Sequence, residues 1–510
     1  MLAIIDSVAL LGLDGQKVRV EVDVSNGLPA LDIVGLPDAA VREAKDRVRT
    51  AIKNSGLDFP IQRITVNLAP ADLRKEGPAF DLPIAVGILA ATGQINPELF
   101  SGMLFIGELS LDGSVRGVHG VLPLALAARE LGINKLVVPL DNAPEAALVQ
   151  DVQAFGVASL AELSAALKGE TDFPPYESEG LAANNLPEEK ALDFADVRGQ
   201  LAAKRALEVA AAGGHNILML GSPGCGKTML ARRLPSILPD LTFEEAIEVT
   251  KIYSLAGQLS VKNPLVTRRP FRAPHHTSST ASLVGGGRVP RPGEISLAHQ
   301  GVLFMDELPE FHKDSLEALR QPLEDGCVSV SRVAGSFTFP ANIMFVGAAN
   351  PCPCGFLLDK ERECNCTPFQ VQRYMNRISG PLLDRIDLHL EVPKISYSEL
   401  NDAPPGESSL QIKTRVEQAR FIQRERLKDL PISCNATMRA REVRRFCKPD
   451  AAASKLLQEA FKRMALSARS HDRILKVART IADLDGSEVI SINHVAEAIQ
   501  YRGLDRLFRF

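Results

Sequence analysis

The stretch that decides the fold is Gly221-Ser-Pro-Gly-Cys-Gly-Lys-Thr228, which fits the pattern G-x-x-x-x-G-K-[ST]. An apolar, strand-like run over His215 to Leu220 leads into it, and a helical pattern follows it. In such a phosphate-binding loop, glycines let successive backbone N–H groups face the phosphates at the N-terminus of a helix. Lys227 is then expected to reach the β- and γ-phosphates of ATP, and the hydroxyl of Thr228 to bind Mg²⁺. The residues expected around the nucleotide are Gly221, Ser222, Pro223, Gly224, Cys225, Gly226, Lys227 and Thr228.

Two more apolar strands of the same region end in polar side chains. Gly301-Val-Leu-Phe-Met-Asp-Glu307 ends in two acids, of which Asp306 is expected to bind Mg²⁺ and Glu307 to polarise the attacking water. The run from Ile343 ends at Asn350, whose amide could reach the same water or the γ-phosphate. A pair of acids after an apolar run can also be a solvated strand end, but the phosphate-binding loop upstream favours the catalytic interpretation.

The chain is predicted to be a multidomain α/β protein. Residues 1–170 mix strand and helix patterns and indicate an α+β domain, and the polar residues 171–190 indicate a linker. Alternating strands and helices predict a parallel sheet in an ATPase core over 191–398, which also holds a cysteine hairpin. Residues 399–510 are predicted to form a helical lid, with helices over 409–427, 451–467, 472–484 and 491–502.

Composition limits the class of protein and its partners. The 58 Lys and Arg against 62 Asp and Glu give a net charge of −4, so any contact with nucleic acid must come from a local basic surface. No apolar stretch reaches the roughly 18 residues that a membrane span requires, so no membrane partner is expected. The N-terminus carries Asp6 and no early Lys or Arg, which indicates a strand and not a signal peptide. Eight cysteines are too sparse for a disulfide scaffold, so we expect the reducing cytoplasm.

Four of the cysteines form two close pairs, Cys352-Pro-Cys354 and Cys364-Asn-Cys366. Four thiolates from two converging segments can form a tetrahedral zinc site. Zinc knuckles more often use C-x-x-C, so reduced thiols without a metal remain the alternative. The adjacent histidines His275 and His276 are not expected to bind a metal, because neighbouring side chains point in different directions.

The gap between Thr228 and Asp306 is too long for one helix and one strand, so it must contain an insertion. Basic residues of this insertion, together with its glycines, are suited to contact DNA phosphates while the protein moves along the strand. A solvated charged face is the alternative. A hairpin is predicted over Val328 to Phe339, with Arg332 near its turn. The candidate DNA-binding residues are Arg268, Arg269, Arg272 and Arg332.

The three strand ends and the helical tail resemble those of AAA+ ATPases. Leu382-Leu-Asp-Arg-Ile-Asp387 is similar to the segment that presents an arginine finger to the neighbouring subunit's ATP in the branch with magnesium chelatase and MCM helicases. The resemblance implies that Arg385 acts in trans and that Arg469 is a second sensor, acting in cis from the lid. Arg473 competes for the second role, and surface ion pairs are the alternative for both. The predicted hairpin resembles one that MCM-type motors insert into their pore, where Arg332 would touch a DNA strand.

Residues 1–170 resemble the protease domain of Lon. The resemblance lies in Gly107-Glu-Leu-Ser-Leu-Asp-Gly and Val137-Val-Pro-Leu-Asp-Asn. Where that family has its catalytic Ser and Lys, this chain has Ala79 and, nearby, Pro123. Neither side chain can attack a carbonyl or supply an amine, so this domain is expected to be a scaffold without peptidase activity.

The whole order of domains resembles the YifB/ComM family. Further matching segments are Ile33-Val-Gly-Leu-Pro37, Arg269-Pro-Phe-Arg-Ala-Pro-His-His276 and Ala348-Ala-Asn-Pro-Cys-Pro-Cys-Gly355. The resemblance implies a hexameric, ATP-driven DNA motor or helicase that promotes branch migration in homologous recombination during natural transformation, with single-stranded and branched DNA as partners. Two alternatives stay open: the ATPase subunit of a magnesium chelatase, and an ATP-dependent protease or protein remodelling factor.

Overall fold

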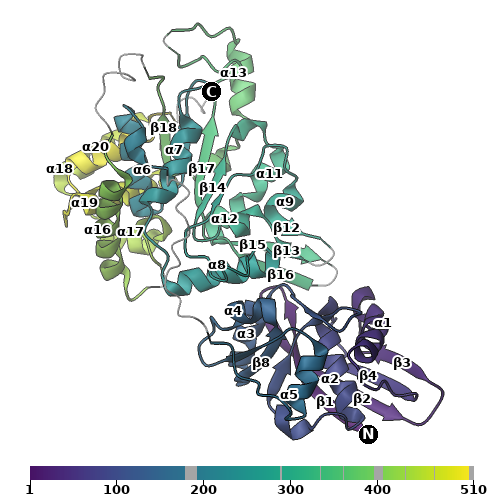
Figure 1. Ribbon diagram of the computed structural model, residues 1–510. Helices are drawn as coiled ribbons and strands as arrows, with labels where there is room; N and C mark the ends of the chain where they lie inside the picture. Colours follow the sequence, from purple (N-terminus) through teal and green to yellow (C-terminus); the bar gives the residue numbers. More distant parts are fainter. Residues whose placement is uncertain are drawn as a thin grey trace. The chain divides into compact units, whose positions relative to one another are not determined.

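The phosphate-binding loop continues one strand of a five-stranded parallel sheet in the computed structural model (Figure 1). Each pair of neighbouring strands is parallel, so the strand ends that carry Gly221, Asp306 and Asn350 meet at one edge. β10, β14 and β17 are buried along their whole length, which explains their unbroken apolar sequences. In order across the sheet, the strands are β11 (Phe271–Arg272), β14 (Val302–Met305), β17 (Met344–Ala349), β10 (Ile217–Leu220) and β18 (Leu388–Glu391).

Residues 1–177, 192–287, 290–332, 335–359, 361–395, 406–430, 432–464 and 466–504 are described by the structure. By their contacts the residues form two compact units. The first comprises Met1–Asn184, Phe243–Thr267 and Gly287–Pro292, and the second comprises Asn185–Thr242, Arg268–Gly286 and Gly293–Phe510.

The second unit adds helices and a hairpin to the parallel sheet. α6 (Leu201–Gly213) precedes β10, and α7 (Lys227–Arg233) begins at the end of the phosphate-binding loop. α11 (Lys313–Ala318) and α12 (Arg320–Asp325) follow β14. The predicted hairpin is present as the antiparallel strands β15 (Cys327–Arg332) and β16 (Gly335–Pro340).

The C-terminal part is helical, as predicted. α19 begins at Ala468 instead of residue 472, because the Ser467 side chain accepts a hydrogen bond from the backbone N–H of Ser470 and caps the helix. The helices are α16 (Ser409–Leu427), α17 (Ala440–Phe446), α18 (Ala451–Arg463), α19 (Ala468–Leu484) and α20 (Ile492–Gln500).

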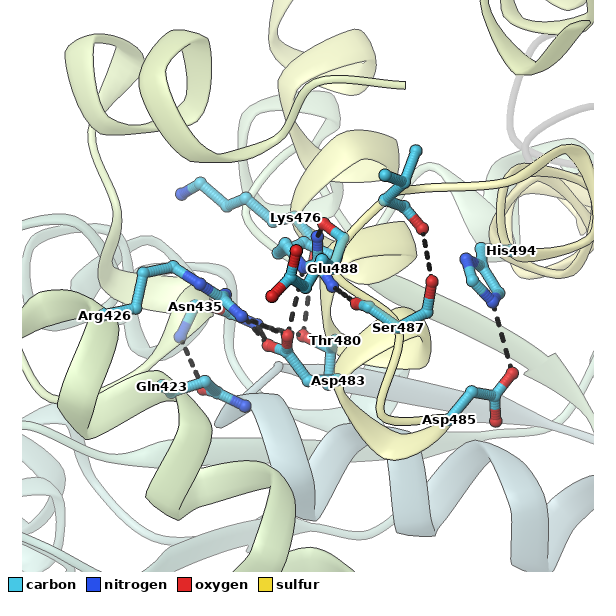
Figure 2. Close-up of polar contacts among 12 residues, drawn as sticks. Gln423, Arg426, Asn435, Lys476, Thr480, Asp483, Asp485, Ser487, Glu488 and His494 are labelled. Carbon is cyan, nitrogen blue, oxygen red and sulfur yellow. Dashed lines mark hydrogen bonds and ion pairs between the residues drawn. The ribbon is translucent and has the colours of Figure 1, made fainter. Parts of the chain in front are cut away.

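A buried polar network joins these helices (Figure 2). The carboxylate of Asp483 on α19 has no exposed surface, and it accepts hydrogen bonds from Asn435 Nδ2 at 2.8 Å and from Arg426 Nη1 on α16 at 3.0 Å. Arg479 Nε donates to the same carboxylate at 3.1 Å. A buried carboxylate requires such partners, so this network fixes how α16 and α19 pack.

The first unit is built on a seven-stranded mixed sheet, in agreement with the α+β expectation. α2 (Asp81–Ala91) is buried on all sides, which explains its nearly continuous apolar sequence. The strand order is β3 (Ala30–Val34), β4 (Arg63–Ala69), β2 (Asp14–Ser25), β1 (Leu2–Leu11), β5 (Met103–Phe105), β8 (Lys135–Pro139) and β9 (Gln153–Val157).

α8 (Phe243–Ala256) comes from the insertion between α7 and β14, but its contacts belong to the first unit. The carbonyl of Ser254 accepts a hydrogen bond from Gly120 N at 3.1 Å, and its hydroxyl contacts the buried carboxylate of Glu145. Burial raises the pKa of Glu145, against the hydrogen bonds that Ser254, Leu122 and Asn142 donate to it. The sequence boundaries assign this segment to the ATPase core, whereas the structure groups it with the N-terminal unit, where it contacts the helix α3 (Val121–Glu130).

Among the residues with a described structure, no helix combines the length and the apolar sequence needed to cross a membrane.

Candidate active site

Lys227 lies at the start of α7, with its side chain held over the phosphate-binding loop. Gly224 and Gly226 have φ values of +77° and +95°, a conformation that favours glycine, and this explains the glycines of the pattern. Lys227 is 8% exposed, and its Nζ donates to the carbonyls of Gly221 at 2.6 Å and Ser222 at 3.1 Å. The loop and the lysine therefore have the arrangement that phosphate binding requires.

Thr228 on α7 and Asp306, which directly follows β14, come together. The Thr228 hydroxyl donates to Asp306 Oδ2 at 2.6 Å, and the other carboxylate oxygen of Asp306 accepts from the backbone N–H of Glu307 at 2.9 Å. A hydroxyl and a carboxylate are the hard oxygen ligands that Mg²⁺ prefers, so the residues fit this ion. Asn350 directly follows β17 at the same edge of the sheet, and its Oδ1 accepts a hydrogen bond from Lys227 Nζ at 3.2 Å.

Glu307 has an unusual backbone conformation and a partner that the sequence did not indicate. Its φ is +50°, and its side chain is 53% exposed. The Nδ1 atom of His276 lies 3.3 Å from Glu307 Oε2, and the His276 ring packs on those of His275 and Phe311. The position of His276 in the sequence could have indicated this contact, because His276 follows β11, whose end lies at the same sheet edge as Asp306. The sequence alone predicts only that His276 does not bind a metal, and it predicts no role beside Glu307.

Arg385 lies at the amino edge of its own sheet, opposite to the carboxyl edge that carries the phosphate-binding loop. Its carbonyl accepts from Asn216 Nδ2 at 3.1 Å, and Asn216 directly precedes β10. The four residues of β10 separate Asn216 from Gly221, and the five steps between them span about 16 Å at a rise of about 3.3 Å per residue. The Arg385 side chain donates to Pro381 O at 2.8 Å and pairs with Glu324. Within one chain, Arg385 is therefore far from the phosphate-binding loop.

The two arginines considered for the second sensor differ in environment. Arg473 Nε pairs with Asp387 Oδ1 at 3.1 Å, and Asp387 also contacts His215 Nδ1 at 3.2 Å. Burial opposes ionisation of Asp387, but the hydrogen bond to His215 and the charge of Arg473 hold its pKa below the ordinary value. Arg469 is exposed. Burial lowers the pKa of Arg385, and the charges of Arg320, Arg469 and Arg473 add to this effect.

The four cysteines predicted to bind zinc do come together. The Sγ atom of Cys352 lies 3.3 Å from that of Cys354 and 3.6 Å from that of Cys364, and the Cys354 and Cys364 sulfurs are 3.6 Å apart. With Cys366 included, all four sulfurs lie within 4.8 Å of one another. Zn–S bonds of about 2.3 Å in a tetrahedron place sulfurs about 3.8 Å apart, so the residues fit Zn²⁺.

The basic residues predicted to bind DNA have different surroundings. Arg269 donates to the carbonyls of Pro239 at 2.6 Å and Gln300 at 2.7 Å, so it ties loops of the core together. Arg272 forms a bidentate pair with Glu294, at 2.7 and 2.8 Å. Arg268 is exposed. The backbone of Arg332 ends β15, but its side chain lies outside the part of the molecule that the structure describes.

The parallel sheet, the phosphate-binding loop and the polar strand ends, followed by a helical region, define an AAA+-like ATPase of the magnesium chelatase type. Family models give the same result over three segments of the chain. Residues 20–142 match "Subunit ChlI of Mg-chelatase", residues 193–400 match "Magnesium chelatase, subunit ChlI", and residues 406–502 match the C-terminal region of the same subunit.

Relatives cover the whole chain. It is 46% identical to the competence protein ComM of Haemophilus influenzae, over 100% of this chain and 99% of that protein. It is 45% identical to the YifB protein of Escherichia coli, over 99% of this chain and 98% of that protein. The magnesium-chelatase 67 kDa subunit of Chlorobaculum parvum is 30% identical over 31% of this chain and 23% of that subunit. The chain therefore belongs to the YifB/ComM family.

Proposed function

We propose that this protein is a hexameric, ATP-driven DNA motor or helicase that promotes branch migration in homologous recombination during natural transformation. The observation that carries the proposal is the full-length identity of 46% to a protein named for competence. The ATP site supplies the energy source that such a motor needs. The proposed partners are single-stranded and branched DNA, and the proposed location is the cytoplasm.

In this proposal the residues at the carboxyl edge of the sheet bind and hydrolyse ATP. Lys227 contacts the β- and γ-phosphates, and Thr228 and Asp306 hold Mg²⁺, which neutralises charge on the phosphates. Glu307 polarises the attacking water. Asn350 holds the ammonium of Lys227, from which its Oδ1 accepts a hydrogen bond at 3.2 Å. These groups orient the reactants and stabilise charge, which is what phosphoryl transfer requires.

Arg385 acts on the ATP of a neighbouring subunit. The position of Arg385 at the amino edge of its own sheet supports this role. The phosphate-binding loop of the same chain lies about 16 Å away along β10, so Arg385 cannot reach the phosphates bound there. Arg469 is the second sensor and acts in cis from the lid, as the family resemblance implies. Arg473 is held by Asp387 and is a positioning residue for the lid. Hydrolysis therefore requires a ring.

DNA passes through the pore of this ring. Pore binding needs no basic exterior, so it agrees with the net charge of −4. We assign the pore contact to the β15–β16 hairpin with Arg332 and, because of its exposure, to Arg268. The N-terminal unit is a Lon-like scaffold that carries Ala79 where a nucleophile would be needed. Zinc bound by Cys352, Cys354, Cys364 and Cys366 is structural in this proposal.

An ATPase titration with single-stranded, duplex and branched DNA tests the proposal. We expect ATP hydrolysis to rise with DNA and to rise most with branched DNA. The partial identity to a magnesium-chelatase subunit favours a chelatase-type ATPase as the second candidate. Hydrolysis that no DNA stimulates would favour that candidate. ATP-dependent degradation of casein would instead favour a protease.

A further inference from the structure

The loop between the two cysteine pairs lies against the phosphate-binding loop. Gly355 packs closely on Pro223, because a Cβ atom at Gly355 would lie 2.6 Å from Pro223 Cδ. The φ of Gly355 is +85°, so glycine is required there for its backbone conformation as well. The pKa of Asp359, in the same loop, is lowered mainly by the backbone N–H of Glu361 and to a smaller extent by the nearby side chain of Ser222. The loop between the cysteine pairs therefore lies beside two consecutive residues of the phosphate-binding loop, Ser222 and Pro223.

The strand that leads into the cysteine cluster also contacts the phosphate-binding loop. The backbone N–H of Gly221 donates to the carbonyl of Ala349 at 3.3 Å, and Asn350 accepts from Lys227 at 3.2 Å. Cys352 follows two residues later and is fully buried. The phosphate-binding loop is thus contacted both by the strand before the cluster and by the loop that the cluster closes.

Packing alone offers this loop little support. Of the described residues between Cys352 and Cys366, Gly355 alone is buried, and Leu357 is 36% exposed. A segment that buries so little apolar surface cannot offset the entropy of ordering its backbone. A bond from each of four thiolates to one ion would supply the missing free energy, as structural zinc does in small domains.

We propose that Zn²⁺ held by Cys352, Cys354, Cys364 and Cys366 keeps this loop against the phosphate-binding loop and thereby sets the affinity of the chain for ATP. The inference rests on the zinc site and the ATP site of the proposed function. Without the ion, the contacts of Gly355 and Asp359 loosen, and nucleotide binding must order the phosphate-binding loop as well. We expect the nucleotide affinity to fall at least tenfold.

The test compares the full-length chain before and after zinc removal. Zinc is counted by elemental analysis, and the affinity for a fluorescent ADP analogue is measured by titration with Mg²⁺ present. Treatment with a zinc chelator under reducing conditions should raise the dissociation constant at least tenfold, and added Zn²⁺ should restore the original value. Circular dichroism before and after treatment reports whether the chain has kept its secondary structure.

Variants separate the effect of the metal from damage to the fold. Gly355→Ala places a methyl group into Pro223 and leaves all four thiols in place, so it should keep about one zinc per chain and still weaken nucleotide binding. Cys352→Ser with Cys354→Ser should lose both zinc and affinity. Cys327→Ser is the matched control, because Cys327 lies outside the cluster, and it should change neither quantity.

Three outcomes would overturn the inference, each in a recognisable way. If zinc removal and Gly355→Ala both leave nucleotide affinity unchanged, the zinc site stands but does not support the phosphate-binding loop. If the purified chain contains no stoichiometric zinc and binds nucleotide, the zinc site itself is wrong. If the zinc-loaded chain binds no nucleotide, the ATPase function proposed above fails, and the inference fails with it.

Discussion

A mixture of two inactive variants would show whether Arg385 completes the ATP site of a neighbouring subunit. Arg385→Ala keeps the phosphate-binding loop and Glu307 but lacks the finger, and Glu307→Gln keeps the finger but cannot polarise water. Loss of an arginine finger lowers turnover on the order of 10³- to 10⁵-fold. Each variant alone should therefore be inactive, although both should bind nucleotide as the native chain does.

The expected recovery follows from counting junctions in the mixed ring. A productive junction needs Glu307 from one subunit and Arg385 from the next, that is, one subunit of each variant in the right order. In an equal, random mixture this occurs at about one half times one half, or about one quarter, of the junctions in a closed ring. The mixture should therefore hydrolyse ATP at about a quarter of the native rate.

The same assay decides where Arg469 acts. If Arg469 acts on the neighbouring site, Arg469→Ala mixed with Glu307→Gln should also recover about a quarter of the native rate. Arg469→Ala mixed with Arg385→Ala should then recover nothing, because no subunit supplies both arginines. A cis role gives the reverse pair of results. Confirmed mixed rings in which neither arginine variant is rescued by Glu307→Gln would refute the trans assignment.

Four further predictions concern other parts of the molecule. Lys227→Ala should abolish nucleotide binding, whereas Glu307→Gln should bind normally and stop hydrolysis; normal turnover in Glu307→Gln would remove its role. Arg332→Ala should leave basal ATPase activity intact and lower the slope of log affinity for DNA against log salt by about one unit, while an unchanged slope would exclude a phosphate contact. Removal of zinc should also impair strand displacement, and metal-free native protein that still remodels DNA would contradict this. Asp483→Ala should destabilise the lid by about 3–5 kcal/mol, because it leaves Arg426 without its buried partner, and a thermal midpoint equal to that of the exposed control Asp485→Ala would contradict it.

Much of the core could be predicted because the local sequence encodes it directly. The strands that end at Gly221, Asp306 and Asn350 are continuous apolar runs, and parallel strands must end at one edge, so their polar ends had to meet. The hairpin β15–β16 follows from alternation and a glycine at the turn. The cysteine cluster was predicted from two close pairs, and the structure brings the four sulfurs together.

Other features depend on tertiary contacts that no local pattern contains. α8 has an apolar face that could cover either unit, and its contact with Glu145 on the N-terminal unit became visible only in the structure. Arg269 looks like a DNA contact in sequence, because charge alone does not show that backbone carbonyls of Pro239 and Gln300 surround the side chain. His276 could not be predicted for the same reason, since its partner Glu307 follows a different strand, β14.

The length of the strands explains why this ATP site should depend on assembly. Binding groups lie at the carboxyl edge of the sheet, and Arg385 lies near the amino edge, about 16 Å of strand away. The strands are hydrogen bonded to one another and buried, so no local motion brings the two edges of one sheet together. Asp387 pairs with Arg473 on α19 and contacts His215 before β10, so the helix that begins beside Arg469 is fastened to the same amino edge. A single chain should therefore bind ATP with one edge of its sheet and hydrolyse it only when the other edge of a second chain supplies Arg385.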